Sequence, residues 1–189
     1  FEHPENLTVL NQDALTIQTL PVDPTVLVAN LPYNVSVPVL LHLLEKFASL
    51  RTGVVMVQAE VADRLAAKPG TKDYGIPSVK AAWWAEVKGA GSVSRSVFWP
   101  APNVDSKLVS FTRRQTPGDE VLRRKVFTII DAAFAQRRKM LRSALSSLYG
   151  SSSAAEQILQ RADIDPTLRG EALEISSFCA IAAVAPDIF

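Results

Sequence analysis

The sequence predicts an α/β protein: a sheet with a mixed edge and flanking helices, followed by a small part made only of helices. Two observations support this prediction. Before residue 116, short β-prone apolar runs alternate with amphipathic segments of helical length, and after the turn-forming stretch 115–118 only helical spacing remains. The composition, 48% apolar and 21% charged over 189 residues, is that of an ordinary folded chain. We therefore expect one domain over 1–115 and a second over 116–189.

The first domain should open with strands that lack polar alternation, which is typical of strands buried on both faces. We expect these strands at 7–10, 26–29 and 54–57. Helical spacing predicts helices over 36–48, with Ser36 as a cap, and over 60–67 and 74–82. Later strands are expected over 86–98, broken at 89–91, and over 107–112, where polar and apolar residues alternate.

The second domain should consist of helices joined by short connections. A helix is expected over 121–135, a basic helix then extends to Tyr149, and a further helix covers 154–162. Asp165 followed by Pro166 is typical of a helix start, and Ser176 or Ser177 should cap a last apolar helix.

Composition excludes several classes of protein. A single cysteine, Cys179, excludes a disulfide framework and a cysteine zinc cluster, and the two histidines are too far apart in sequence to form a metal pair. The apolar run 179–185 has seven residues, far fewer than the roughly 20 of a membrane span. The chain does not start with a signal-like segment. We expect a cytoplasmic, monomeric protein without a metal ion or a membrane partner.

The net charge of +1 conceals a basic cluster. Residues 123–142 hold seven basic side chains and one acid, and helical spacing places Arg137 inside the apolar face unless the helix breaks near 135–136. We favour the break, which groups cations at the start of a new helix, where they suit a phosphate backbone. These candidate RNA-binding residues are Arg137, Arg138, Lys139 and Arg142. The alternatives are a solvated helix face, or ion pairs to acids such as Asp163, Asp165 and Glu171.

The loop Asn30-Leu31-Pro32-Tyr33 follows a predicted strand, where open α/β sheets bind their ligands. These residue types suit a reaction at the exocyclic amine of adenine. That amine is a poor nucleophile because its lone pair is delocalised into the ring. The Asn30 oxygen and a backbone carbonyl can accept its two hydrogens, while Tyr33 stacks on the base. Pro32 fixes the backbone and offers no competing N–H group. The alternative is a simple turn with Asn30 as its cap.

Six blocks in order along the chain resemble the ribosomal RNA adenine N6-dimethyltransferases of the KsgA/RsmA type. The blocks are 30–36, 57–65, 68–75, 98–106, 133–141 and 164–171. The resemblance implies a Rossmann-like domain and a small helical domain. It also implies S-adenosylmethionine as methyl donor and substrate, and two adjacent adenines near the 3′ end of small-subunit 16S rRNA as acceptors. The role implied is in ribosome biogenesis.

The resemblance also assigns roles to individual residues. Asn30 matches the residue that bridges donor and target amine, Leu31 and Pro32 supply the loop backbone, and Tyr33 matches the stacking residue. Phe98 matches an aromatic residue on the opposite face of the target, with a core aromatic as its alternative. Asp13, with Ala14 beside it, matches the acid that holds the donor's adenine, with a loop cap as its alternative. Packing roles are expected for Trp83, Trp84, Trp99 and Met56.

The family's glycine-rich loop and its ribose-binding acid are missing from this sequence. No glycine precedes Gly53, and Gly89-Ala90-Gly91 lies downstream of the Asn30 loop. The chain also begins at Phe1. We therefore expect a fragment without the first strands of its domain, with an incomplete donor site and little activity alone.

Three other functions remain open. A large-subunit rRNA methyltransferase of the antibiotic-resistance type shares the Asn-x-Pro-Tyr loop, but the basic block and the 164–171 segment favour the small-subunit enzyme. A non-catalytic ribosome-assembly factor is disfavoured because Asn30 and Tyr33 are both present. A protein glutamine or DNA adenine methyltransferase is disfavoured by Leu31, where those loops usually carry proline.

Overall fold

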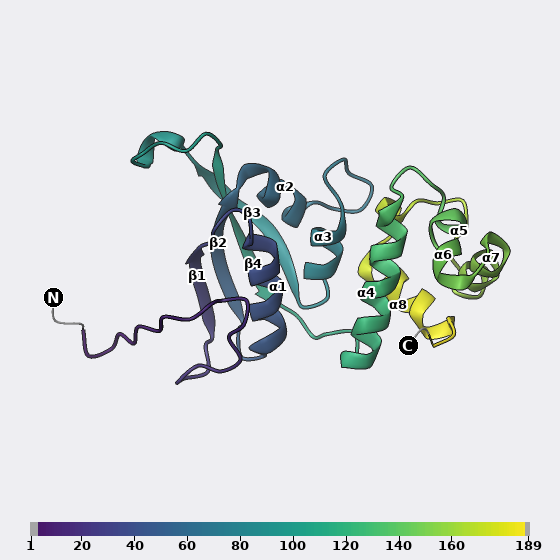
Figure 1. Ribbon diagram of the computed structural model, residues 1–189, viewed down its shortest axis with the longest axis horizontal. Coiled ribbons are helices and arrows are strands. Elements are labelled where there is room, and N and C mark those ends of the chain that lie inside the picture. The colour runs from purple at the N-terminus through teal and green to yellow at the C-terminus, as the bar shows by residue number, and fades with distance from the viewer. Residues whose placement is uncertain (1–3, 188–189) are drawn as a thin grey trace.

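The computed structural model describes residues 4–187 and contains a four-stranded mixed sheet (Figure 1). The strand order is β1-β2-β4-β3, and β1 runs parallel to β2 while β4 runs antiparallel to both of its neighbours. A mixed edge is therefore confirmed. The strands are β1 (Val26–Asn30), β2 (Thr52–Gln58), β3 (Ala85–Val93) and β4 (Ser106–Arg113).

Helices α1 to α3 lie on one side of the sheet, and the remaining helices lie beyond α3, with α4 next to it (Figure 1). The first group comprises α1 (Ser36–Lys46), α2 (Ala59–Ala66) and α3 (Ile76–Ala81). The second group comprises α4 (Glu120–Ala135), α5 (Leu141–Ala144), α6 (Ser146–Tyr149), α7 (Ser152–Arg161) and α8 (Ile175–Val184). Residue 116, near which the sequence predicts a domain boundary, lies in the connection from β4 to α4.

Two strand predictions are wrong. Residues 7–10 are exposed and form no strand, because no described strand lies beside them to complete a hydrogen-bonded ladder. The expected break at 89–91 is instead a bulge within the continuous strand β3, where the pairing with β4 shifts register. Gly91 has a φ of +130°, which L side chains rarely adopt, so glycine is needed at this bulge.

The expected burial of β1 on both faces is also wrong. Val26 is 55% exposed and Val28 is 81% exposed, and both lie on the edge strand of the described sheet. The apolar run of β1 therefore reflects β propensity at an edge whose second face carries no helix within residues 4–187.

The helical part differs from expectation in its connections. The predicted break after Ala135 is confirmed, but the basic helix beyond it is two short helices, α5 and α6. No α-helix starts at Asp165, because its Oδ1 accepts hydrogen bonds from the backbone N–H and the hydroxyl of Thr167 and closes a single turn. The last helix begins at Ile175, one residue before Ser176.

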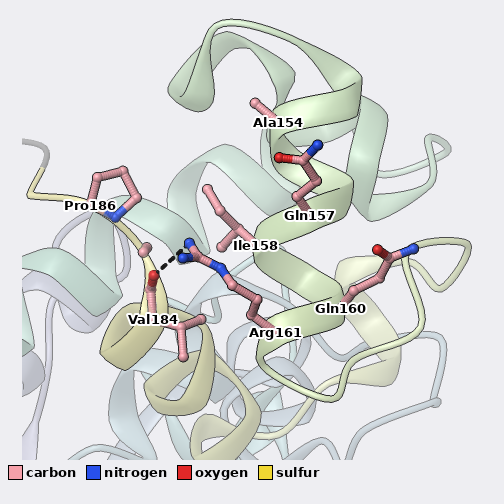
Figure 2. A pocket seen from close by; sticks show the side chains of 8 residues that line it. Ala154, Gln157, Ile158, Gln160, Arg161, Val184 and Pro186 are labelled. Atoms are coloured by element: carbon pink, nitrogen blue, oxygen red, sulfur yellow. Dashed lines mark hydrogen bonds between the residues drawn. The ribbon is translucent and has the colours of Figure 1, made fainter.

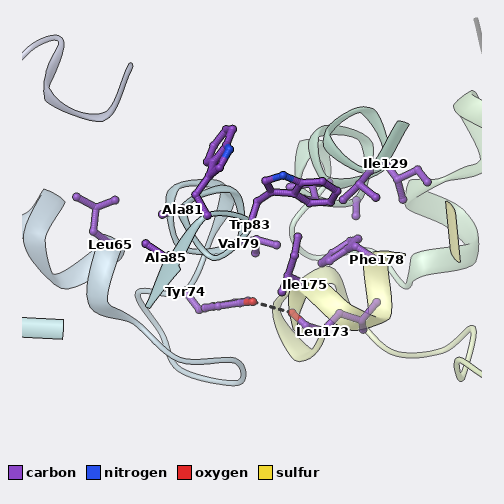
Figure 3. Close-up of a cluster of buried hydrophobic side chains, with 14 of the residues drawn as sticks. Leu65, Tyr74, Val79, Ala81, Trp83, Ala85, Ile129, Leu173, Ile175 and Phe178 are labelled. Atoms are coloured by element: carbon purple, nitrogen blue, oxygen red, sulfur yellow. Dashed lines mark hydrogen bonds between the residues drawn. The ribbon is translucent and has the colours of Figure 1, made fainter. Parts of the chain in front are cut away.

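One hydrophobic cluster joins the sheet to the helical part (Figure 3). Trp83 and Trp84 pack edge-on against Phe127 of α4. The Tyr74 hydroxyl donates a 2.8 Å hydrogen bond to the Leu173 carbonyl, and burial raises the pKa of Tyr74 to about 12. The helical part is thus held against the sheet by continuous packing.

Candidate functional site

A pocket of about 360 Å³ lies where the loop after β1 faces the segment between β3 and β4. It brings together all five residues that the sequence marked as catalytic, although they come from two segments far apart in the chain. The lining consists of Asn30, Leu31, Pro32, Tyr33, Phe98, Pro100 and Pro102. One amide, two aromatic rings and three prolines thus surround one space.

The backbone of the β1 loop is anchored on both sides. Leu31 is buried, and its N–H donates a 3.1 Å hydrogen bond to the Met56 carbonyl, which extends the pairing of β1 with β2. The Ser36 hydroxyl donates to the Tyr33 carbonyl at 3.2 Å, as the first residue of α1 and not as its cap. Anchoring of this kind fixes the position of Asn30 between the strand and the helix.

Asn30 is exposed, and its side-chain amide makes no hydrogen bond to any residue between 4 and 187. A carboxamide oxygen accepts hydrogen bonds and its NH₂ group donates them. Asn30 can therefore bind an amine or a carbonyl of a ligand in the pocket without first breaking a contact within the described chain.

The ring of Tyr33 is held by a hydrogen bond of 2.7 Å between its hydroxyl and the hydroxyl of Ser106. Ser106 is the first residue of β4 and is 1% exposed. Sequence reasoning missed Ser106, although it ends the 98–106 block. Its position in the sequence could have indicated this role, because Ser106 begins the strand that directly follows the Phe98 segment.

Asp13 and Ala14 lie outside this pocket. Both are exposed, and the Asp13 carboxylate accepts a hydrogen bond of 2.9 Å from the Leu15 N–H, so it closes a local turn as the loop-cap alternative describes. Of the three residues expected at the donor site, only Asn30 lines the pocket. The structure therefore does not bring Asp13 and Ala14 together with Asn30 in this pocket.

The four expected RNA-binding cations divide into two kinds. Arg137 pairs with Glu171 at 3.0 Å and also donates to the Lys72 carbonyl, while Arg142 pairs with Glu156 at 3.3 Å. Arg138 and Lys139 are exposed and form no ion pair with a described side chain. These two lie in the turn after α4, and the next helix begins only at Leu141, not at Arg137 as expected.

Trp99 departs most from its expected packing role. Its side chain is 96% exposed, whereas Trp83 and Trp84 are buried as predicted. The physical reason is its place on the segment between β3 and β4, which projects beyond the sheet (Figure 1).

A larger pocket, of about 780 Å³, lies between α7 and the residues that follow α8 (Figure 2). Its one charged lining residue, Arg161, already donates a 2.8 Å hydrogen bond to the Val184 carbonyl. None of the predicted site residues lines this pocket. Residues 4–187 also contain no cluster of side chains that could hold a metal ion and no helix long and apolar enough to cross a membrane.

Solved structures define the class of fold. The chain superposes on a dimethyladenosine transferase from Plasmodium falciparum with a TM-score of 0.78 at 22% identity, covering 94% of this chain and 71% of that one. It superposes on the 23S rRNA methyltransferase ErmE with a TM-score of 0.64 at 21% identity, covering 95% and 72% of the two chains. The sheet with its helices is thus a Rossmann-like methyltransferase fold followed by a helical part, as the resemblance implied.

Sequence comparison identifies the family. The profile described as "Ribosomal RNA adenine dimethylase" matches residues 1–186, and the chain belongs to this family. It is 59% identical over 175 residues to the ribosomal RNA small subunit methyltransferase A of Arthrobacter sp. (strain FB24), covering 93% of this chain and 59% of that protein. It is 56% identical over 189 residues to the protein of that name from Streptomyces griseus, covering 99% and 65%. The chain therefore spans about 60% of the length of these curated relatives.

Proposed function

We propose that the complete gene product containing this chain transfers methyl groups from S-adenosylmethionine to N6 of two adjacent adenines near the 3′ end of 16S rRNA. The observation that most strongly supports this proposal is that Asn30, Tyr33 and Phe98 line one pocket. The relatives at 56–59% identity, whose names specify the small ribosomal subunit, support this choice of RNA. The role proposed for the protein is therefore in ribosome biogenesis, with the small subunit as its partner.

The proposed chemistry follows from what each residue offers. The Asn30 oxygen accepts a hydrogen from the target amine, which localises the nitrogen lone pair toward the methyl group that S-adenosylmethionine supplies when bound. Tyr33 and Phe98 hold the faces of the base, and the pocket's prolines limit backbone motion around it. Transfer of the methyl group from the sulfonium breaks the S–CH₃ bond and leaves a positively charged, acidic nitrogen. This cation releases its proton to water, so no strong base is required.

The proposed RNA contacts lie in the turn after α4. Arg138 and Lys139 are exposed without an ion pair in the described chain, which suits contact with phosphates. Arg137 and Arg142 already form ion pairs with Glu171 and Glu156, so a contact of either arginine with phosphate would be additional to its ion pair. We propose 116–189 as the RNA-binding domain and 1–115 as part of the methyltransferase domain, in a protein that acts as a monomer.

Two other functions are less well supported. The likeness to ErmE, at 21% identity, shows a common fold and says nothing about which ribosomal RNA is the substrate. A non-catalytic assembly factor would have no need of the Asn30 amide beside two aromatic rings in an open pocket.

The test is methyl transfer by the complete gene product, because this chain spans about 60% of the length of the curated relatives it matches. Methyl-labelled S-adenosylmethionine is incubated with the protein and either small or large ribosomal subunits from cells that lack the enzyme. We expect label in small-subunit RNA at adjacent adenines, as N6,N6-dimethyladenine. Label confined to large-subunit RNA would support the resistance-type alternative, and no label in either RNA would support the non-catalytic one.

A further inference from the structure

Trp99 is a large aromatic side chain with no packing role in the described protein. It is 96% exposed, whereas the other two tryptophans are 1% and 4% exposed. Tryptophan is highly buried on average, so a fully exposed indole on a projecting segment suggests a binding role. Its chain neighbours Phe98 and Pro100 both line the pocket, while Trp99 itself does not.

The backbone explains this difference between neighbours. Phe98 is extended, with φ of −106° and ψ of 147°, and successive side chains of an extended backbone point to opposite sides. Phe98 therefore faces the pocket and Trp99 faces away from it across the same segment. The segment is closed by an ion pair of 3.0 Å between Arg95 and Asp105, and prolines 100 and 102 limit its flexibility.

We propose that Trp99 stacks on the base next to the target adenine, so that the 98–100 segment separates two neighbouring bases of the bound RNA. This inference rests on the proposed function, because it takes the occupant of the pocket to be an RNA base. In a single strand, the next base lies one nucleotide away from the base held against Phe98. Trp99 offers an aromatic face for that next base. Trp99 is thus a positioning residue that contributes to RNA affinity and does not touch the reacting amine.

The experiment uses tryptophan fluorescence of the 189-residue chain itself. Because Trp83 and Trp84 are buried, quenching by acrylamide reports mainly on Trp99, and a neutral quencher is not repelled by RNA. The probe is a short single-stranded RNA with two adjacent adenines, whose binding is measured independently by the anisotropy of a terminal dye. We expect saturating RNA to reduce the quenching constant several-fold, to near the value of a Trp99→Phe variant.

Variants then separate stacking from other effects. Trp99→Ala should weaken RNA binding by roughly 5- to 150-fold, the range that corresponds to loss of one stacked base, and Trp99→Phe should restore most of the affinity. Val97→Ala is the matched control, because Val97 is 66% exposed on the same segment and does not line the pocket. It should bind RNA within about twofold of the parent chain.

Each other outcome counts against the inference. RNA that binds without protecting Trp99, or a Trp99→Ala variant with parental affinity, would overturn it and leave the proposed function intact. Protection that grows with protein concentration in the absence of RNA would assign Trp99 to a protein contact instead. Failure of the parent chain to bind any of the RNA would contradict the RNA-binding role in the proposed function, and the inference with it.

Discussion

Tyr33 contributes to the pocket in two separable ways, through its ring and through its hydroxyl. Its ring lines the space proposed for the base, while its hydroxyl bonds to the buried Ser106 outside that lining. A ring that stacks needs to be held in one orientation, and a hydrogen bond to a fixed strand residue limits its rotation. The proposed function therefore makes the ring essential and the hydroxyl supportive.

Tyr33→Phe should therefore be mild and Tyr33→Ala severe. In the complete gene product, we expect Tyr33→Phe to reduce methyl transfer less than about tenfold, since one neutral hydrogen bond contributes about 1 kcal/mol. Tyr33→Ala loses the stacked face, about 1–3 kcal/mol, and opens the pocket as well. Initial rates at several RNA concentrations would separate the effect on KM from the effect on kcat.

Ser106→Ala is the matched control, since it removes the same hydrogen bond and leaves the ring in place. It should resemble Tyr33→Phe. Equal losses for Tyr33→Phe and Tyr33→Ala would show that the hydroxyl, and not the ring face, is what methylation needs.

The turn after α4 combines one arginine that bonds to other segments of the chain with two exposed cations. Arg137 ties this turn to Glu171 and to the Lys72 carbonyl, which belongs to the segment between α2 and α3. Arg138 and Lys139 have no such contact among the described residues. Three consecutive cations are therefore expected to respond differently to substitution.

A variant carrying Arg138→Gln and Lys139→Gln should lower the slope of log affinity against log salt by about 1.4–1.8, because each phosphate contact contributes about 0.7–0.9. Its Tm should remain close to that of the parent chain. Arg137→Gln should show the opposite pattern, a lower Tm with a smaller change in slope. An unchanged salt slope in the double variant would remove these two residues from the RNA interface.

Sequence periodicity predicted the helices and strands whose apolar side chains pack into the core. It failed where the structure of a segment depends on a hydrogen-bond partner elsewhere in the chain or on a local side-chain hydrogen bond. The helix break after Ala135 could be predicted because Arg137 did not fit the apolar face. The strand expected at 7–10 could not be excluded, because a strand exists only with a partner beside it. The turn at Asp165 uses a side-chain hydrogen bond that competes with the predicted cap.

Residues 4–187 form one packed unit, in which the edge strand β1 is left exposed on one face. The hydrophobic cluster of the described residues runs from the sheet into the helical part, while Val26 and Val28 on the edge strand are exposed. The grouping of Asn30 and Tyr33 with Phe98 follows from this arrangement, because β4 lies beside β2 and brings the Phe98 segment to the end of β1. The sequence motifs predicted both halves of the pocket, but Ser106 and the exposure of Trp99 needed the three-dimensional structure.

Asn30, in the proposed function, acts on the reacting amine and not on RNA affinity. The most direct test is single-turnover methyl transfer by the complete gene product with Asn30→Ala, and with Asn34→Ala as control, since Asn34 is exposed in the same segment and does not line the pocket. We expect Asn30→Ala to slow transfer by on the order of 100-fold or more, with RNA affinity within about twofold, because a contact made in the transition state affects rate and not binding. A rate within a few-fold of the parent, or an equal loss in Asn34→Ala, would contradict the assigned role of Asn30.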